Sequence, residues 1–106
     1  MRINITARHF NASDRLKQYT EKEVRRLKRY YDGILNCDVI LDWEKQAQVA
    51  EIVLHVYGTK LTVREKSEDM YKSINLAVDK LERQLKKYKG KLHTFDNTRA
   101  RDLIAE

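Results

Sequence analysis

The 106-residue chain has one cysteine, three glycines and no proline. The single cysteine, Cys37, cannot form a disulfide within the chain, which is typical of a reducing compartment. The absence of proline leaves no obvious hinge, and so few glycines leave no phosphate-binding loop of the GxxxxGKS/T or GxGxxG type. No run of eighteen apolar residues is present, and the first residues lack the apolar core of a signal peptide. These absences, with the length, predict a single-domain cytoplasmic protein without a membrane partner.

Groups suited to catalysis or metal binding are also sparse. The three histidines, His9, His55 and His93, are scattered, and their spacing from cysteine or aspartate matches no metal site. Cys37 falls on the inward side of an expected strand, where a structural cysteine is far commoner than a nucleophile. We therefore expect no enzymatic activity, no metal, no cofactor and no small-molecule substrate.

The positive charge is concentrated in two segments. The net charge is +6, and 36% of the residues are charged. Residues 14–31 carry seven basic and three acidic side chains, and residues 79–92 carry six basic and two acidic ones. Surface helices are often rich in lysine and glutamate for solubility alone. Such a concentration within two segments nevertheless favours a basic surface that binds a polyanion.

Four segments alternate apolar and polar residues, as half-buried strands do. They are residues 2–7, 37–42, 50–57 and 61–64. A polar connection is expected from Trp43 to Gln48, and a tight turn at Gly58 and Thr59.

Two longer segments have the apolar spacing of helices. The first begins near Asp14, with Asn11 or Ser13 as its cap, and Gly33 marks its stop. Its apolar stripe consists of Leu16, Tyr19, Thr20, Leu27, Tyr30 and Tyr31, with Val24 at the edge. Glu23 falls inside this stripe, where it either lies at a margin or pairs with a neighbouring cation.

The second helix begins after Ser67, a candidate cap, and Glu68 and Asp69 suit its positively charged N-terminal end. Its apolar residues recur at alternating spacings of four and three, which places them on one helical stripe. They are Ile74, Val78, Leu81, Leu85, Tyr88 and Leu92. Residues 93–106 have weak periodicity and are expected to form a polar tail after a domain of residues 1–92.

The resulting order, β-α-β-β-β-α, predicts an α+β fold. A right-handed crossover makes the first two strands parallel, and short links make the remaining pairs antiparallel. Both helices then cover one face of a four-stranded sheet, giving a two-layer sandwich.

Each helix also carries a basic stripe. Lys80, Arg83, Lys87 and Lys91 form a row about 16 Å long, roughly 120° around the axis from the apolar stripe. Arg15, Lys22, Arg26 and Arg29 fall within a sector of roughly 60° on the first helix. If the helices pack side by side, the stripes border one positive groove able to follow a phosphate backbone. Two independent solvated faces are the alternative.

Some charges and aromatic residues have more ordinary roles. Asp79–Arg83 and Glu82–Lys86 have the spacing of pairs that support a helix. Tyr71 could stack on a base, although packing of Met70 or Tyr71 beneath the sheet edge is the simpler interpretation. Trp43, in a loop, is a weak sign of a contact surface.

Three segments resemble the ribosome hibernation promoting factor family, which includes ribosome-associated inhibitor A and proteins once called sigma-factor modulation proteins. They are INITARH at residues 3–9, LKQYTEKEVRRLKRYY at residues 16–31 and DMYKSINLAVDKLERQLKKYKGKL at residues 69–92. The last block is the most specific. Two departures are Glu23, where members often carry a base, and Asn75, where aspartate is commoner.

The resemblance implies a cytoplasmic, non-enzymatic inhibitor of translation that binds the small ribosomal subunit and its ribosomal RNA when growth stops. Such factors occupy the decoding region, where messenger and transfer RNA would lie. Carried over by position, the RNA-binding residues are Arg26 and Arg29 with Lys80, Arg83 and Lys87. Lys22 and Lys91 extend the same stripes by geometry, and Arg8 is a weaker candidate.

The resemblance further implies a short family member, without the second dimerisation domain of longer ones, and a monomer is the default. Two other functions stay open on the sequence alone. One is a general double-stranded RNA-binding module, since α+β sandwiches can recognise A-form shape. The other is an adaptor whose basic helices bind an acidic protein.

Overall fold

The computed structural model describes the backbone of residues 1–105 and the side chains of residues 1–90. Its elements are β1 (Arg2–Arg8), α1 (Asp14–Arg25), the 3-10 helix η1 (Arg26–Arg29), β2 (Ile34–Glu44), β3 (Ala47–Val56), β4 (Thr59–Ser67) and α2 (Met70–Ala105). The predicted α+β class and the order β-α-β-β-β-α are confirmed.

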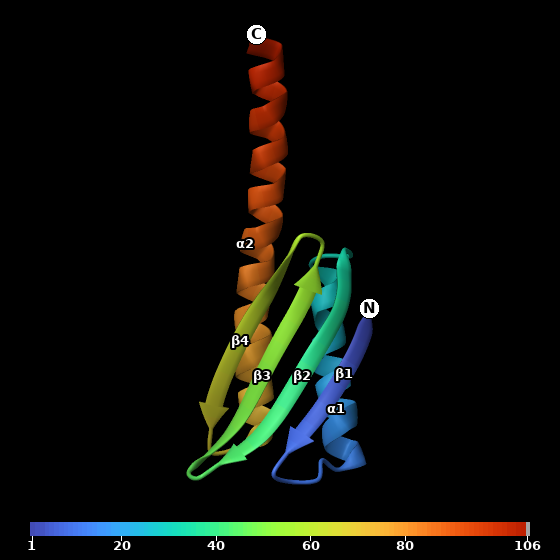
Figure 1. Ribbon diagram of the computed structural model, residues 1–106, viewed down its shortest axis with the longest axis vertical. Helices are drawn as coiled ribbons and strands as arrows, with labels where there is room; N and C mark the ends of the chain where they lie inside the picture. The colour runs from blue at the N-terminus through green and yellow to red at the C-terminus, as the bar shows by residue number, and fades with distance from the viewer. Residues whose placement is uncertain (106) are drawn as a thin grey trace.

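The four strands form one sheet in the order β1-β2-β3-β4. β1 pairs with β2 in parallel, and the two following pairs are antiparallel, as the sequence predicts. Figure 1 shows both helices on the same side of this sheet, which leaves the other side open. The protein is therefore the expected two-layer sandwich.

The core fills the space between the sheet and the helices. Alternate strand residues such as Val39, Ile52 and Leu54 point inward and are at most 1% exposed. α2 contributes a fully buried stripe that includes Leu81 and Leu85. This burial is the main term that stabilises the fold, because removing such a side chain typically costs about 2–5 kcal/mol.

The apolar stripe of α1 is rotated from the prediction. Val24, expected at its edge, is fully buried, whereas Tyr19 and Tyr30 are only partly buried. The two tyrosines lie toward α2, where Tyr19 packs edge-on against Tyr71 with ring centroids 4.9 Å apart. The buried stripe is therefore centred on Val24, and the two tyrosines lie at its margin beside α2.

The strands of the first hairpin, β2 and β3, are longer than predicted. β2 runs through Glu44 and β3 begins at Ala47, so the expected polar connection is a turn of only two residues. Trp43 therefore lies in a strand and not in a loop. The turn predicted at Gly58 and Thr59 lies one residue earlier, at Tyr57 and Gly58, because β4 already begins at Thr59. Gly58 adopts a φ of 82°, a left-handed conformation that glycine tolerates best.

The start of the first helix agrees with the prediction, and the other helix ends differ from it. Ser13 caps α1, accepting a 3.1 Å hydrogen bond from the Leu16 amide. Asp69, not Ser67, caps α2, because its carboxylate accepts a 3.0 Å hydrogen bond from the Tyr71 amide. The first helix also tightens into η1 after Arg25. Gly33 is not the helix stop that was predicted, because η1 already ends at Arg29. Gly33 instead allows a close approach, since a side-chain carbon there would lie 2.5 Å from the Tyr31 ring.

The last helix continues past the predicted domain end at residue 92. The backbone of residues 93–105, expected to be a tail, extends α2, and Figure 1 shows this part projecting beyond the sheet. The molecule is consequently elongated, with principal extents of 59 × 24 × 18 Å. The division at residue 92 stays a prediction, but it coincides with no break in the helix.

Nothing in the helical segments of residues 1–105 has the length and apolar character that a membrane crossing needs.

Candidate nucleic-acid interface

The outward faces of the two helices carry exposed cations. Lys22 lies on α1 and Arg29 ends η1, while Arg83 and Lys87 lie on the fourth and fifth turns of α2. All four side chains are exposed, and none forms an ion pair with any residue of the described range 1–90. Their charge is therefore available to a ligand.

Arg26 has a different environment from the other predicted site residues. Its guanidinium donates to Glu23 within the first helical segment and lies 4.0 Å from Glu82 of α2. The hydrogen bond to Glu23 is the main reason that the pKa of Arg26 is raised. This arrangement explains Glu23, which pairs with a neighbouring cation at the margin of the stripe. Arg26 links the two helices, and part of its charge is neutralised.

Glu82 extends this link along α2. Its carboxylate forms an ion pair with Lys86 at 3.4 Å, as the spacing predicted. The Lys86 ammonium also lies 4.8 Å from the centre of the Tyr30 ring. Hydrogen bonding to the Tyr30 hydroxyl holds the pKa of Glu82 below its ordinary value. We call the line formed by Glu23, Arg26, Glu82, Lys86 and Tyr30 the helix seam.

The helix seam places two carboxylates, Glu23 and Glu82, within the predicted groove. Lys80 pairs with Glu65 of β4 at 3.4 Å, so the Lys80 side of α2 faces the sheet edge. Glu82, on the side of α2 that faces α1, instead contacts Arg26. The predicted positive groove is therefore interrupted by these carboxylates, and its role in binding stays a prediction.

Two predicted residues fall elsewhere. Arg8, at the end of β1, pairs in register with Asp42 and alternates with the inward Ala7, so it lies on the open face of the sheet, away from the helices. Lys91 belongs to α2, but its side chain lies outside the described residues. The structure brings together Lys22, Arg26, Arg29, Lys80, Arg83 and Lys87 on the helix layer.

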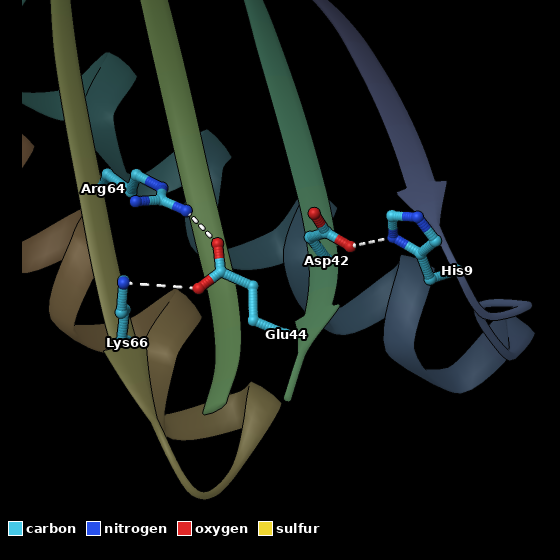
Figure 2. A network of polar contacts seen from close by, with 5 residues as sticks. All are labelled: His9, Asp42, Glu44, Arg64 and Lys66. Atoms are coloured by element: carbon cyan, nitrogen blue, oxygen red, sulfur yellow. Dashed lines mark hydrogen bonds and ion pairs between the residues drawn. The ribbon is translucent and has the colours of Figure 1, made fainter. Parts of the chain in front are cut away.

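On the open face of the sheet, two cations of β4 and one histidine contact carboxylates (Figure 2). Glu44 of β2 contacts both Arg64 and Lys66 of β4, the latter at 3.3 Å. Asp42 accepts a 2.7 Å contact from His9, whose hydrogen bond lowers the pKa of this carboxyl. Each of these pairs joins residues that are distant in the sequence.

A second set of contacts lies nearer the middle of the open face. Asp38 accepts a 3.0 Å hydrogen bond from Asn4 and lies 3.0 Å from His55. The Asn4 bond is the main cause of the lowered pKa of Asp38. Polar groups from three strands thus form a cluster that helps fix the register of the sheet.

The sequence predicted only some of these partners. The Glu82–Lys86 pair is confirmed, but Asp79 and Arg83 form no ion pair. Helical spacing alone cannot separate these cases. The Lys80–Glu65 pair was missed because it joins residues whose contact depends on the packing of α2 against β4. No local signal identifies such a partner.

Cys37 is an inert core residue, as the sequence predicted. It is fully buried, and desolvation raises the pKa of its thiol to about 12. Met70 is also buried, and the half-buried Tyr71 packs on Tyr19, in agreement with their predicted packing role. Across residues 1–90, no group of three or more histidine, cysteine or carboxylate side chains is placed to hold a metal ion.

Known proteins resemble the chain over nearly all of this domain. Residues 3–93 match the family described as sigma 54 modulation protein / S30EA ribosomal protein. A ribosome hibernation promoting factor from Azotobacter vinelandii is 41% identical over 91 residues, which are 86% of this chain and 85% of that protein. The factor of the same name from Escherichia coli (strain K12) is 34% identical over 92 residues, 87% of this chain and 97% of the relative.

Solved structures agree with these sequence matches. A ribosomal subunit interface protein from Coxiella burnetii superimposes with a TM-score of 0.81 at 32% identity, over 85% of this chain and 99% of that one. The N-terminal domain of Protein Y from Thermus thermophilus gives a TM-score of 0.77 at 36% identity, over 83% and 99% of the two chains. Sequence and fold therefore point to the same relatives.

Proposed function

Because this chain belongs to the sigma 54 modulation protein / S30EA ribosomal protein family, we propose that it is a ribosome hibernation factor that binds the small ribosomal subunit through its helix layer. The family resemblance found in the sequence is confirmed. The relatives are named as ribosome hibernation promoting factors and a ribosomal subunit interface protein, which are ribosome factors and not enzymes.

One observation supports the proposed binding surface most strongly. Lys22, Arg29, Arg83 and Lys87 are exposed cations without an ion pair in residues 1–90, and all lie on helical backbone anchored by a buried core. A cation that no carboxylate neutralises loses little on contact with a phosphate, and it releases condensed counterions from the RNA. A rigid support lowers the conformational entropy that binding must overcome.

The proposed RNA-binding residues fall into two groups. Arg83 and Lys87 make direct phosphate contacts from α2, and Lys22 and Arg29 make them from the first helical segment. Lys80 exchanges its contact with Glu65 for a phosphate. Arg26 orients the two helices through the helix seam and contributes less to binding, because Glu23 and Glu82 share its charge. Lys91 extends the row of cations on α2. Arg8 contacts RNA only if part of the RNA also lies against the open face of the sheet.

Occupancy of the decoding region is the proposed mechanism of inhibition. A body of 24 × 18 Å in cross-section, held by phosphate contacts on one layer, would exclude messenger and transfer RNA by volume alone. No covalent step, metal or cofactor is required. The proposed place of action is the cytoplasm, during slow growth or stress, with the protein acting as a monomer.

The test is sedimentation of the protein with purified small subunits and whole ribosomes at about 0.1–0.2 M salt, with an equal mass of random duplex RNA as competitor. We expect saturable, nearly one-to-one sedimentation with the small subunit that resists the competitor. If the duplex competitor abolishes sedimentation with the small subunit, a general double-stranded RNA-binding module would be favoured instead. Binding that survives nuclease digestion of the RNA would favour an adaptor for an acidic protein.

A further inference from the structure

The end of the sheet opposite the projecting helix carries an exposed aromatic stack. The rings of Phe10 and Trp43 lie parallel, 2° apart in orientation, with centroids separated by 4.8 Å. Phe10 follows β1, and Trp43 lies near the end of β2. Trp43 nevertheless remains 51% exposed. A large ring held flat by one stacking partner offers its remaining surface to a second planar group.

Two clefts meet at this tryptophan. One, of about 260 Å³, lies along the turn between β2 and β3 and extends to Glu68. The other, of about 220 Å³, lies between Phe10 and the start of α2 and includes Asp69. Trp43 and Gln48 line both clefts. A side chain lying on the indole would therefore have room on either side.

The charge around the clefts selects a cation as the occupant. Their charged lining residues are Glu44, Glu68, Asp69 and Lys45. Glu44 is already neutralised by the cations of β4, but Glu68 and Asp69 form no ion pair within residues 1–90. By contrast, a cleft at the other end of the helix layer is lined by Arg29, Lys86 and Lys89 and by no acid. The two ends thus suit ligands of opposite charge.

The nearby helix starts do not reverse this preference. Helix N-termini attract anions when their amide groups are free. Here the Asp69 carboxylate already accepts the Tyr71 amide, and Ser13 accepts the Leu16 amide at the start of α1. Asp14 adds a further negative charge in the first turn of α1. A phosphate would meet occupied donors and unpaired carboxylates.

We propose that the Trp43 surface binds an arginine side chain of a protein partner. A guanidinium is planar, stacks on aromatic faces and binds carboxylates with two parallel hydrogen bonds. The indole would provide the stacking surface, and Glu68 would provide the carboxylate. Lysine would bind less well, because its ammonium is strongly hydrated and cannot stack as a plane. This surface is separate from the basic helix layer and does not depend on the function proposed for that layer.

The experiment uses Trp43 itself as the probe, because it is the only tryptophan in the chain. Its fluorescence is followed during titration with an acetylated Gly-Arg-Gly-Arg-Gly peptide at low salt. We expect a saturable change, about three- to tenfold weaker binding of the lysine peptide, and weaker binding still of the uncharged citrulline peptide. Glu68→Gln should weaken binding of the arginine peptide about three- to tenfold.

The matched control is Asp32→Asn, which removes one exposed carboxylate from the connection before β2 and should leave the titration unchanged. A fluorescence change with a six-nucleotide oligoadenylate, but not with the arginine peptide, would overturn the proposal in favour of base stacking. No saturable response to the arginine peptide would also overturn it. Equal responses to the arginine and citrulline peptides would exclude the proposed role of charge.

Discussion

The two outer faces of the sandwich place charged side chains in different surroundings. On the open face of the sheet, Arg64 and Lys66 are held by Glu44, and histidines pair with Asp38 and Asp42. On the helix layer, Arg83 and Lys87 have no such partner in the described part of the chain. The paired charges of the sheet face stabilise the fold, whereas the unpaired charges of the helix layer are available for binding.

The difference shows why net charge alone does not locate a binding site. A paired cation must give up its carboxylate before it can contact a phosphate, and that exchange offsets most of the gain. An unpaired cation on the same molecule gains the full contact. The pairing pattern, which only the folded structure supplies, therefore shows which cations of a basic surface are available to a ligand.

The largest expected effect comes from reversing charge on the helix layer. Arg83→Glu with Lys87→Glu should reduce affinity for the small subunit by about 100-fold or more, because two phosphate contacts become repulsions. Stability should change by less than about 0.5 kcal/mol, since both side chains are exposed. Sedimentation measures the first quantity, and thermal unfolding by circular dichroism measures the second.

The matched control reverses two exposed cations at the sheet. Arg2→Glu with Lys60→Glu makes the same change in net charge away from the helix layer. This variant should bind within about threefold of the original protein at about 0.15 M salt, where long-range effects are screened. An equal loss of binding in both variants would contradict a localised interface.

An intermediate effect is expected at the helix seam. Glu82→Gln removes the carboxylate that pairs with Lys86 and partly neutralises Arg26. Affinity for the small subunit should therefore rise about two- to fivefold. Stability should fall by about 1 kcal/mol, because the hydrogen-bonded link between the helices is weakened. Reduced affinity in a folded Glu82→Gln variant would instead indicate that the seam must be intact for RNA to bind.

A smaller effect, confined to stability, is expected on the sheet face. Glu44→Gln leaves Arg64 and Lys66 without their shared carboxylate, which should lower the free energy of unfolding by about 1 kcal/mol or less. Affinity for the small subunit should not change. Urea unfolding and sedimentation together test the pair of outcomes, and a clear change in affinity would assign this network to the interface.

The smallest effect concerns the pKa of Asp38. Asn4→Ala removes the hydrogen bond that most strongly lowers this pKa, so NMR titration should show it rising toward its ordinary value of 3.8. Because the folded pKa lies below the unfolded one, the stabilisation is complete above about pH 4 and is lost as pH falls through the folded pKa. The stability difference between the two proteins should therefore shrink in strong acid. An unchanged Asp38 pKa would exclude Asn4 as its cause.

The sequence predicted the fold well because its signals were local. Alternation identified each strand, and the spacing from Ile74 to Leu85 identified the buried face of α2. Helix ends and strand lengths were less certain, since the two-residue turn before Ala47 carries no glycine or asparagine that would mark it. The continuation of α2 past residue 92 had little periodicity to indicate it.

The candidate site was predicted in composition but not in geometry. Helical spacing correctly placed the cations Arg83 and Lys87 on the outer face. It could not reveal that Glu65 holds Lys80 or that Arg26 connects the two helices, because both contacts join distant parts of the sequence. These partners depend on how the helices pack, and they decide which cations are free to bind.

The salt dependence of binding to the small subunit tests the central claim most directly. About five to seven phosphate contacts predict a slope of roughly −4 to −6 for the logarithm of affinity against the logarithm of salt concentration. Replacing Arg83 and Lys87 by glutamine should make that slope shallower by about 1.4–1.8, at roughly 0.7–0.9 for each contact. A slope that is the same for the original protein and this variant would show that these cations do not contact RNA phosphates, and would contradict the account.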